Sequence, residues 1–197
     1  LAAGRIDGYC VGEPWNTVAA SSGAGRIVTT KAAIWPKSLE KVLGMRTDWA
    51  SANEETLRRL IVALEAAAVW CDAPENHGEL AAILAAPDYL DVAPDRILAG
   101  LGGELALGSA APKRIADFHS FAAGDATEPR VNHALWLFSQ MVRWGQASLG
   151  EDAVATVRAT MRPDIRARAL GLDPARHGGL QPVRLFDGLT FAPDALA

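Results

Sequence analysis

The sequence predicts an α/β protein that is rich in helix toward its C-terminal end. Three observations predict this class: short β-branched segments alternate with helix starts in the first fifty residues, two long amphipathic helical patterns follow, and shorter helical segments occupy most of the rest. The expected strands are too few to form a full sheet alone. We therefore expect a missing part of the protein to supply further strands.

The first fifty residues hold the expected strands. Ile6–Val11 and Arg26–Thr30 are short and apolar or β-branched, and Val42–Arg46 is a third candidate. A short helix is expected to begin at Pro14, because proline suits the first helical turn, and to end before Gly23. The chain begins without an initiator Met, and its first residues have a composition typical of the end of a helix. We expect a fragment whose export signal, if it has one, lies outside these residues.

The clearest helical pattern follows Ser51 and Asn53, either of which can cap it, and Pro74 ends it. One face of this helix is apolar and comprises Leu57, Leu60, Ile61, Leu64, Ala68 and Cys71. A second long helix is expected over Val131–Leu149. Shorter helices are expected over 75–85, 94–101, 151–161 and 163–170, with an irregular connection over 102–130 and an extended tail over 178–197.

Composition excludes several classes of protein. The net charge of −4 argues against a nucleic-acid surface, which is usually basic, so no direct nucleic-acid partner is expected. The two cysteines, Cys10 and Cys71, form no CxxC pair, and whether they form a disulfide stays open. The four scattered histidines make no metal-ligand cluster, so we expect neither a metal nor a cofactor. The chain has no GxSxG, P-loop or HExxH motif, and we expect no enzyme activity.

Three motifs occur in order along the chain. Residues 5–16 read RIDGYCVGEPWN, residues 35–44 read WPKSLEKVLG, and Asn132–Trp136 begins an aromatic run that ends at Trp144-Gly145. This series resembles the nitrate/nitrite/bicarbonate-binding proteins of ABC importers, the substrate-binding family that includes a cytoplasmic nitrate-sensor branch. The chain departs from the family at Ser38-Leu39, where the family usually has His-Pro.

The resemblance implies a periplasmic-binding-protein-like bilobal fold (type II), with this chain as its C-terminal half only. Residues 1–25 would be the end of the second lobe and a cleft strand. Residues 26–197 would be the crossover and the C-terminal helical part, and the N-terminal half would be missing. The ligand of such a protein lies between the lobes.

The implied ligand is nitrate or nitrite, with bicarbonate as the alternative. An importer component would work with an ABC permease and ATPase, in the periplasm or at the membrane. The alternative is a cytoplasmic sensor of the same fold that controls an antiterminator partner. An enzyme of this fold, such as a thiamine-precursor synthase, would need a nucleophile or cofactor residues, and the sequence shows none.

Four residues are candidate ligand contacts. By resemblance, Lys41 meets the anion, and a lysine in a closed cleft supplies a charge and donors; the alternative is a surface lysine paired with Glu40. Gly12, before a helix start, lets backbone N–H groups approach an anion, or is a turn glycine. Glu13 is favoured as a capping residue, with acceptance of a bicarbonate hydroxyl, cation binding or orientation of Lys41 as alternatives. Trp15 walls the cleft or packs in the core.

Three further aromatic side chains, His133, Trp136 and Trp144, mark one face of the second long helix. No nucleophile or metal partner lies near them in the sequence. Packing inside a lobe is therefore the expected role of this face.

Overall fold

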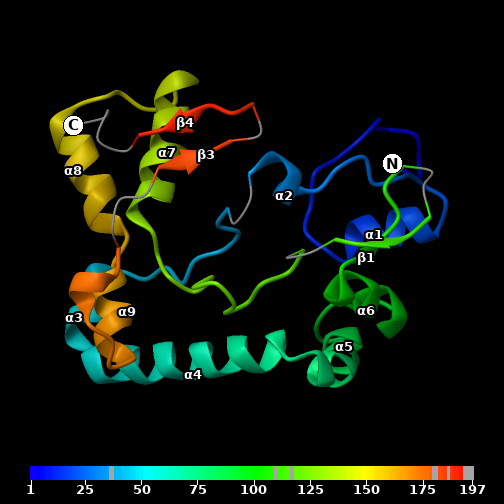
Figure 1. Ribbon diagram of the computed structural model, residues 1–197, viewed down its shortest axis with the longest axis horizontal. Helices are drawn as coiled ribbons and strands as arrows, with labels where there is room; N and C mark the ends of the chain where they lie inside the picture. The colour runs from blue at the N-terminus through cyan, green and yellow to red at the C-terminus, as the bar shows by residue number, and fades with distance from the viewer. Residues whose placement is uncertain (36–37, 109–110, 116–117, 179–181, 186, 193–197) are drawn as a thin grey trace. The chain divides into compact units, whose positions relative to one another are not determined.

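The computed structural model describes residues 1–35, 38–108, 111–115, 118–178, 182–185 and 187–192 (Figure 1). The chain folds into two compact units. Unit 1 comprises Leu1–Ala33 and Ala68–Gly124, and unit 2 comprises Ile34–Ala67 and Asp125–Ala197. The expected division at residue 25 stays a prediction.

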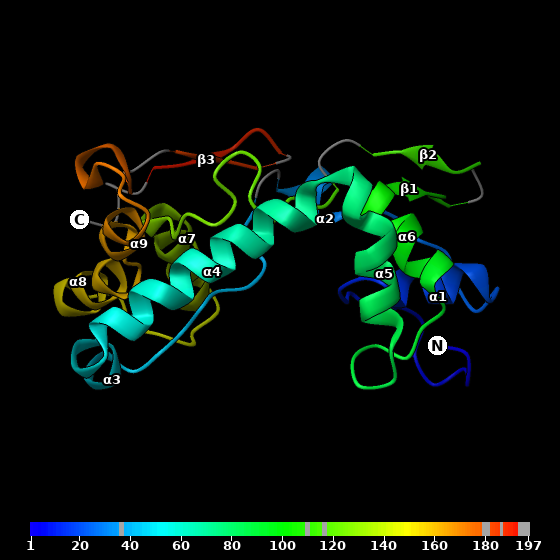
Figure 2. The ribbon, with the colours of Figure 1, turned by 90° about the horizontal axis from the view of Figure 1, so that it is seen from below.

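The described residues of unit 1 form three complete helices and one hairpin, with parts of two further helices. Its main elements are α1 (Trp15–Ser21), the 3-10 turn η1 (Pro74–Asn76), α5 (His77–Ala85), α6 (Pro94–Gly102), β1 (Glu104–Leu105) and β2 (Lys113–Arg114). The strands β1 and β2 pair antiparallel, as Figure 2 shows. The short helix α2 (Lys31–Ile34) and the long helix α4 (Glu54–Asp72) contribute residues to both units.

The core of unit 1 lies between α5 and α6. Ala81, Val92 and Ile97 are buried together, and Val18 of α1 packs against them. Gly103 directly follows the last residue of α6, and its φ of +68° is left-handed, the usual geometry of a helix C-terminus. A side chain at Gly103 would meet the carbonyl oxygen of Ile115 at 2.8 Å, so the close approach of the hairpin requires glycine there.

Unit 2 is built from helices and a second hairpin. Its elements are α3 (Thr47–Ala52), α7 (Val131–Arg143), α8 (Glu151–Thr160), α9 (Pro163–Ala169), the 3-10 turn η2 (Pro174–Arg176), β3 (Val183–Arg184) and β4 (Thr190–Phe191). The strands β3 and β4 pair antiparallel. The core forms where α7 packs on α8, with Leu135, Phe138 and Val154 buried together.

The helices agree closely with the predicted ones. The predicted helices over 75–85, 94–101, 151–161 and 163–170 are observed within one or two residues at each end. One correction concerns α7, which ends at Arg143 and not at Leu149. Gly145 adopts a left-handed φ of +70°, which stops the helix, and Ala147 packs back on the core. Another concerns the two expected caps of α4: Ser51 is wrong, because it lies inside α3. Asn53 does stand directly before α4, and its carbonyl accepts the Leu57 N–H at 2.9 Å, while its side-chain amide donates to the Trp49 carbonyl of α3.

The predicted strands are largely wrong. Ile6–Val11 and Val42–Arg46 run without any strand assignment, and only Ile27 of the segment 26–30 makes an isolated parallel bridge, to Leu107. Each of these segments is described in full. A β-branched segment becomes a strand only when a neighbour pairs with its backbone, and the described residues supply no such neighbour here. In its described residues the connection over 102–130 is irregular as expected, apart from Gly102, which ends α6, and the hairpin of β1 and β2.

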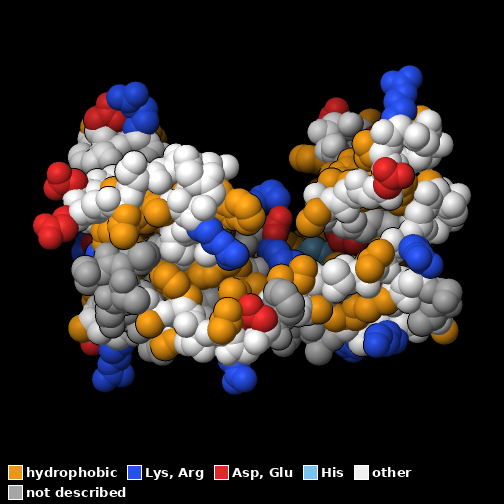
Figure 3. Space-filling view, turned by 90° about the horizontal axis from the view of Figure 1, so that it is seen from above, with side chains coloured by type: hydrophobic (Ala, Val, Ile, Leu, Met, Phe, Trp, Pro, Cys, Tyr) orange, Lys and Arg blue, Asp and Glu red, His pale blue; other side chains and the backbone are white. Residues whose placement is uncertain are grey.

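Large hydrophobic side chains remain on the surface of both units, and Figure 3 shows several groups of them on one face. Helix α4 is an example: only Leu57 of its 19 residues is buried, while Leu60 and Leu64 are 38% and 45% exposed. Its apolar face therefore has the predicted helical spacing but makes little of the core within the described residues. Exposed apolar faces of this kind mark surfaces that bind another protein segment.

Candidate functional site

Glu13 caps the start of helix α1. Its Oε2 accepts a hydrogen bond from the backbone N–H of Thr17 at 3.2 Å, a group that has no partner inside the helix. The side chain also lies beside Gly100 of α6, where an added side chain would meet the Cβ of Glu13 at 3.7 Å. The capping role that the sequence favours is therefore observed.

Helix α1 also holds the irregular segment that precedes it. The hydroxyl of Tyr9 donates to the carbonyl of Trp15 at 3.0 Å, and the amide of Asn16 donates to the carbonyl of Val11 at 2.8 Å. Gly12 follows directly and is exposed, with no atom within 4 Å of the place where a side chain would project. The start of α1 is thus fixed in shape, and the space beside Gly12 is open.

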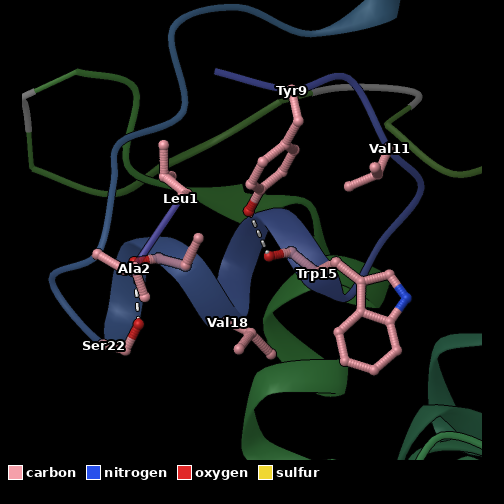
Figure 4. Close-up of a pocket in the computed structure, with 9 residues that line it drawn as sticks. Leu1, Ala2, Tyr9, Val11, Trp15, Val18 and Ser22 are labelled. Carbon is pink, nitrogen blue, oxygen red and sulfur yellow. Dashed lines mark hydrogen bonds between the residues drawn. The ribbon is translucent and has the colours of Figure 1, made fainter. Parts of the chain in front are cut away.

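Trp15 lines a pocket of about 360 Å³ in unit 1 (Figure 4). The pocket walls are mostly apolar and comprise Leu1, Ala2, Tyr9, Val11, Trp15, Val18, Ala19, Ser22 and Ala24. Its two hydroxyls are already engaged, because Tyr9 donates to Trp15 and Ser22 donates to the carbonyl of Ala19. No charged side chain lines it. This pocket suits an apolar group and not an inorganic anion.

Lys41 lies in unit 2, on a segment that is neither helix nor strand, with its side chain 85% exposed. Its Nζ is 3.6 Å from Oε1 of Glu40, an exposed ion pair of the kind that contributes little stability. The structure therefore brings Gly12, Glu13 and Trp15 together at the start of α1 in unit 1, and it places Lys41 in the other unit. In the second motif, Pro36 and Lys37 lie outside the described residues.

An aromatic cluster in unit 2 joins the second and third motifs. The ring of Trp35 meets His133 edge-on at 5.2 Å between centroids and lies 4.4 Å from the ring of Trp136. His133 is buried, and this burial, together with the charge of Arg130, lowers the pKa of its imidazole. The expected packing role of His133 and Trp136 is what the structure shows. Sequence reasoning had no signal that Trp35 would join them.

Trp144 corrects the expected aromatic face. It is 71% exposed and lies at the end of α7, outside the cluster, with the Arg143 guanidinium 5.5 Å from its ring centroid. The physical reason is the helix end: the left-handed Gly145 follows at once, so Trp144 no longer continues the face that begins at His133.

Cys10 and Cys71 are both free thiols, and no group of three or more metal-binding side chains occurs among the described residues. None of the helices in the described part of the chain has the length and apolar character needed to cross a membrane.

The comparisons with known proteins agree with one another. The model of the NMT1-like family matches residues 1–85. The chain is 35% identical to the nitrate import ATP-binding protein NrtC of Synechocystis sp., over 98% of this chain and 29% of that protein. It is 36% identical to the bicarbonate transport ATP-binding protein CmpC of the same organism, over 98% of this chain and 29% of that protein. It is 31% identical to the nitrate/nitrite binding protein NrtA of Synechococcus elongatus, over 97% of this chain and 44% of that protein. The chain thus spans less than half the length of these relatives.

A solved structure gives the same result. The crystal structure of the periplasmic nitrate-binding protein NrtA from Synechocystis PCC 6803 matches with a TM-score of 0.90 at 27% identity, over 99% of this chain and 53% of that one. Over this length the chain therefore has the periplasmic-binding-protein fold, in a helix-rich portion. Over nearly its whole length the chain is thus similar in sequence and fold to the ABC substrate-binding proteins of the family that includes NrtA, and its first 85 residues match the NMT1-like family.

Proposed function

We propose that the protein carrying this chain binds nitrate or nitrite and serves as the substrate-binding component of an ABC importer, with a permease and an ATPase as partners. One observation carries this proposal: the match to NrtA covers 99% of the chain at a TM-score of 0.90. The solved relative is described as periplasmic, and we propose the same location. A binding role without catalysis is part of the proposal.

Lys41 is the proposed charge partner of the anion. Nitrate carries a single delocalised charge, and an ammonium group offers both the opposite charge and up to three donors. Its observed neighbour, Glu40, holds it only by an exposed contact of 3.6 Å, which an anion can replace at low cost.

Gly12 and Trp15 are the other proposed contacts. The open space beside Gly12 lets a small ligand approach the backbone, and Trp15, 46% exposed, offers a flat apolar surface to a weakly hydrated anion. Glu13 is proposed to support these residues by capping α1, since its Oε2 is already held by Thr17.

A second candidate has support of its own. The chain also matches 29% of CmpC, named for bicarbonate transport, and 29% of NrtC, named as an ATP-binding protein. The same kind of domain therefore occurs as part of a longer transport protein, and bicarbonate is the alternative ligand. The sensor that controls an antiterminator partner stays a prediction from the sequence, which none of these relatives' names supports.

Calorimetric titration separates these proposals. The gene product in its native length is titrated with nitrate, nitrite, bicarbonate and, as a control anion, chloride at equal ionic strength. The proposal expects saturable binding of nitrate or nitrite and none of chloride. Saturable binding of bicarbonate alone selects the alternative ligand, and absence of binding to all three contradicts the proposed function.

A further inference from the structure

One side chain fixes the peptide bond between Val11 and Gly12. The side-chain amide of Asn16 donates a hydrogen bond to the carbonyl of Val11 at 2.8 Å. Residues 5–13 are all described, and none of them makes a backbone-to-backbone hydrogen bond. The orientation of the Val11–Gly12 peptide therefore depends on the Asn16 side chain.

The same contact sets the direction of the Gly12 N–H. A trans peptide bond is planar, and its C=O and N–H groups point in opposite directions. Because the Val11 carbonyl is turned toward Asn16, the N–H of Gly12 points away from Asn16. Within the described residues this N–H donates to no other group, and no atom lies within 4 Å of the place where a side chain on Gly12 would project. Gly12 thus offers a directed donor beside open space.

Asn16 itself is held by a packed helix. It is half-buried in α1, and Val18 of the same helix packs against the core of unit 1. The carboxylate of Glu13 caps α1 by accepting from the buried Thr17 at 3.2 Å. Asn16 therefore ties the peptide before Gly12 to an element whose own position is fixed by the core.

We propose that Asn16 is a positioning residue of the anion site, which holds the Val11–Gly12 peptide so that the Gly12 N–H is directed at the bound anion. This inference rests on the proposed function, in which Gly12 contacts the ligand. A donor that is oriented before binding loses little freedom on binding, and this raises affinity. A hydrogen bond to the carbonyl of a peptide also polarises that peptide, so its N–H becomes a stronger donor.

Calorimetry on the gene product in its native length tests the role of Asn16. The wild type is titrated with nitrate, nitrite and bicarbonate, and Asn16→Ala is titrated with the anion that the wild type binds. The dissociation constant of Asn16→Ala is expected to be about tenfold larger, with an unchanged stoichiometry. A purely structural role would lower the Tm and the stoichiometry, because part of the protein would be unfolded, and would leave the dissociation constant unchanged. That result overturns the proposal.

Ser21→Ala is the matched control. Ser21 also lies in α1, and its hydroxyl also donates to a backbone carbonyl, that of Val18, at 3.2 Å. Its loss removes one side-chain-to-backbone hydrogen bond from the same helix without touching the Val11–Gly12 peptide. The dissociation constant of Ser21→Ala is expected to equal that of the wild type. An equal weakening in both variants overturns the role of Asn16, since any disturbance of α1 would then have the same effect.

The Gly12 N–H can be followed directly by NMR. Isotopic labelling of valine carbonyl carbons and glycine nitrogens selects peptides in which glycine follows valine, and Val11–Gly12 is the only such peptide in these 197 residues. In the native-length gene product its signal is the one that disappears in Gly12→Ala. This signal is expected to shift when the anion saturates the wild type. A signal that does not move at saturation shows that the Gly12 N–H makes no contact with the anion, and overturns the proposal.

Failure of this inference and failure of the proposed function give different results. A wild type that binds an anion as tightly as Asn16→Ala does overturns the inference alone. A wild type that binds none of the three anions contradicts the proposed function, and the ligand role of Asn16 is then overturned with it.

Discussion

Arg166 donates a hydrogen bond from Nη2 to Oε1 of Glu65 over 3.0 Å, and the two residues are 101 positions apart in the sequence. Thr127 completes the group: its hydroxyl donates to Oε2 of Glu65 at 2.6 Å and accepts from Arg166 at 2.7 Å. The Arg166 side chain is only 9% exposed and that of Glu65 23%. This group joins α4, the segment before α7 and helix α9 within unit 2.

Loss of one member of the group should be costly. We expect Glu65→Ala to lower the free energy of unfolding by about 3 kcal/mol, because it leaves the buried Arg166 charge without a counter-ion. Urea unfolding measures the change. Glu55→Ala is the control, since Glu55 pairs with Arg58 and Arg59 on the exposed side of the same helix. An equal loss of stability in both variants would mean that burial of the Glu65–Arg166 pair does not increase its contribution to the free energy of unfolding.

Asp72 predicts a dependence of stability on pH. Burial acts to raise the pKa of its carboxyl, but hydrogen bonds from the backbone N–H groups of Phe121, Ala122 and Ala123, with the charge of His77, bring the pKa below its usual value. A lowered folded pKa means that the carboxylate stabilises the fold above the unfolded value of about 3.9. This stabilisation disappears as the pH falls through the folded value.

The matching variant is Asp72→Asn. At pH 7 we expect it to lower the free energy of unfolding by about 2 kcal/mol, the size of hydrogen bonds to a charged group. The difference from the wild type should shrink as the pH falls below about 3.9. Urea unfolding at pH 7, 5 and 3 checks this, with the exposed Asp88→Asn as control. A difference that stays constant down to pH 3 would show that the charge of Asp72 is not what holds the loop.

The helices could be predicted from the sequence because their signals are local. Pro94 at the start of α6, Pro163 at the start of α9 and the acidic first turn of α8 lie within the elements that they define. The strands could not be predicted from the sequence, because strand pairing depends on a distant segment. Ile6–Val11 has the composition of a strand and makes no pair among the described residues. Local composition carries no information about whether a neighbour is present.

The candidate site was predictable only in part, for the same reason. Glu13 as a cap follows from the sequence, since a helix start leaves N–H groups that a nearby carboxylate can accept. Two tertiary contacts of unit 2 could not be predicted from the sequence. Trp35 packs on Trp136, and Glu65 meets Arg166, each across about a hundred residues of chain. Contacts of that separation are set by tertiary packing and leave no periodic signal.

Two substitutions of Glu13 distinguish a residue that only caps α1 from one that also contacts the ligand. Glu13→Gln keeps an oxygen that accepts from Thr17, so we expect stability and nitrate affinity within about twofold of the wild type. Glu13→Ala removes the acceptor and should lower the free energy of unfolding by about 1 kcal/mol. Thermal unfolding and calorimetry measure both. If Glu13→Gln weakened bicarbonate binding while sparing nitrate, Glu13 would be a ligand contact and not only a cap.

Lys41 is the sharpest test of the proposed anion site. In the gene product of native length, Lys41→Ala removes a charge-assisted hydrogen bond to the ligand, and we expect nitrate affinity to fall roughly ten- to a hundredfold. Lys113→Ala is the control: Lys113 is exposed on β2 and belongs to unit 1, and its loss changes the net charge by the same amount. A general electrostatic effect would weaken both variants alike, whereas a direct contact weakens Lys41→Ala alone. Within the described residues Lys41 pairs with Glu40 alone, through an exposed contact, so thermal unfolding should be unchanged. Wild-type nitrate affinity in Lys41→Ala would show that the lysine is an ordinary surface residue.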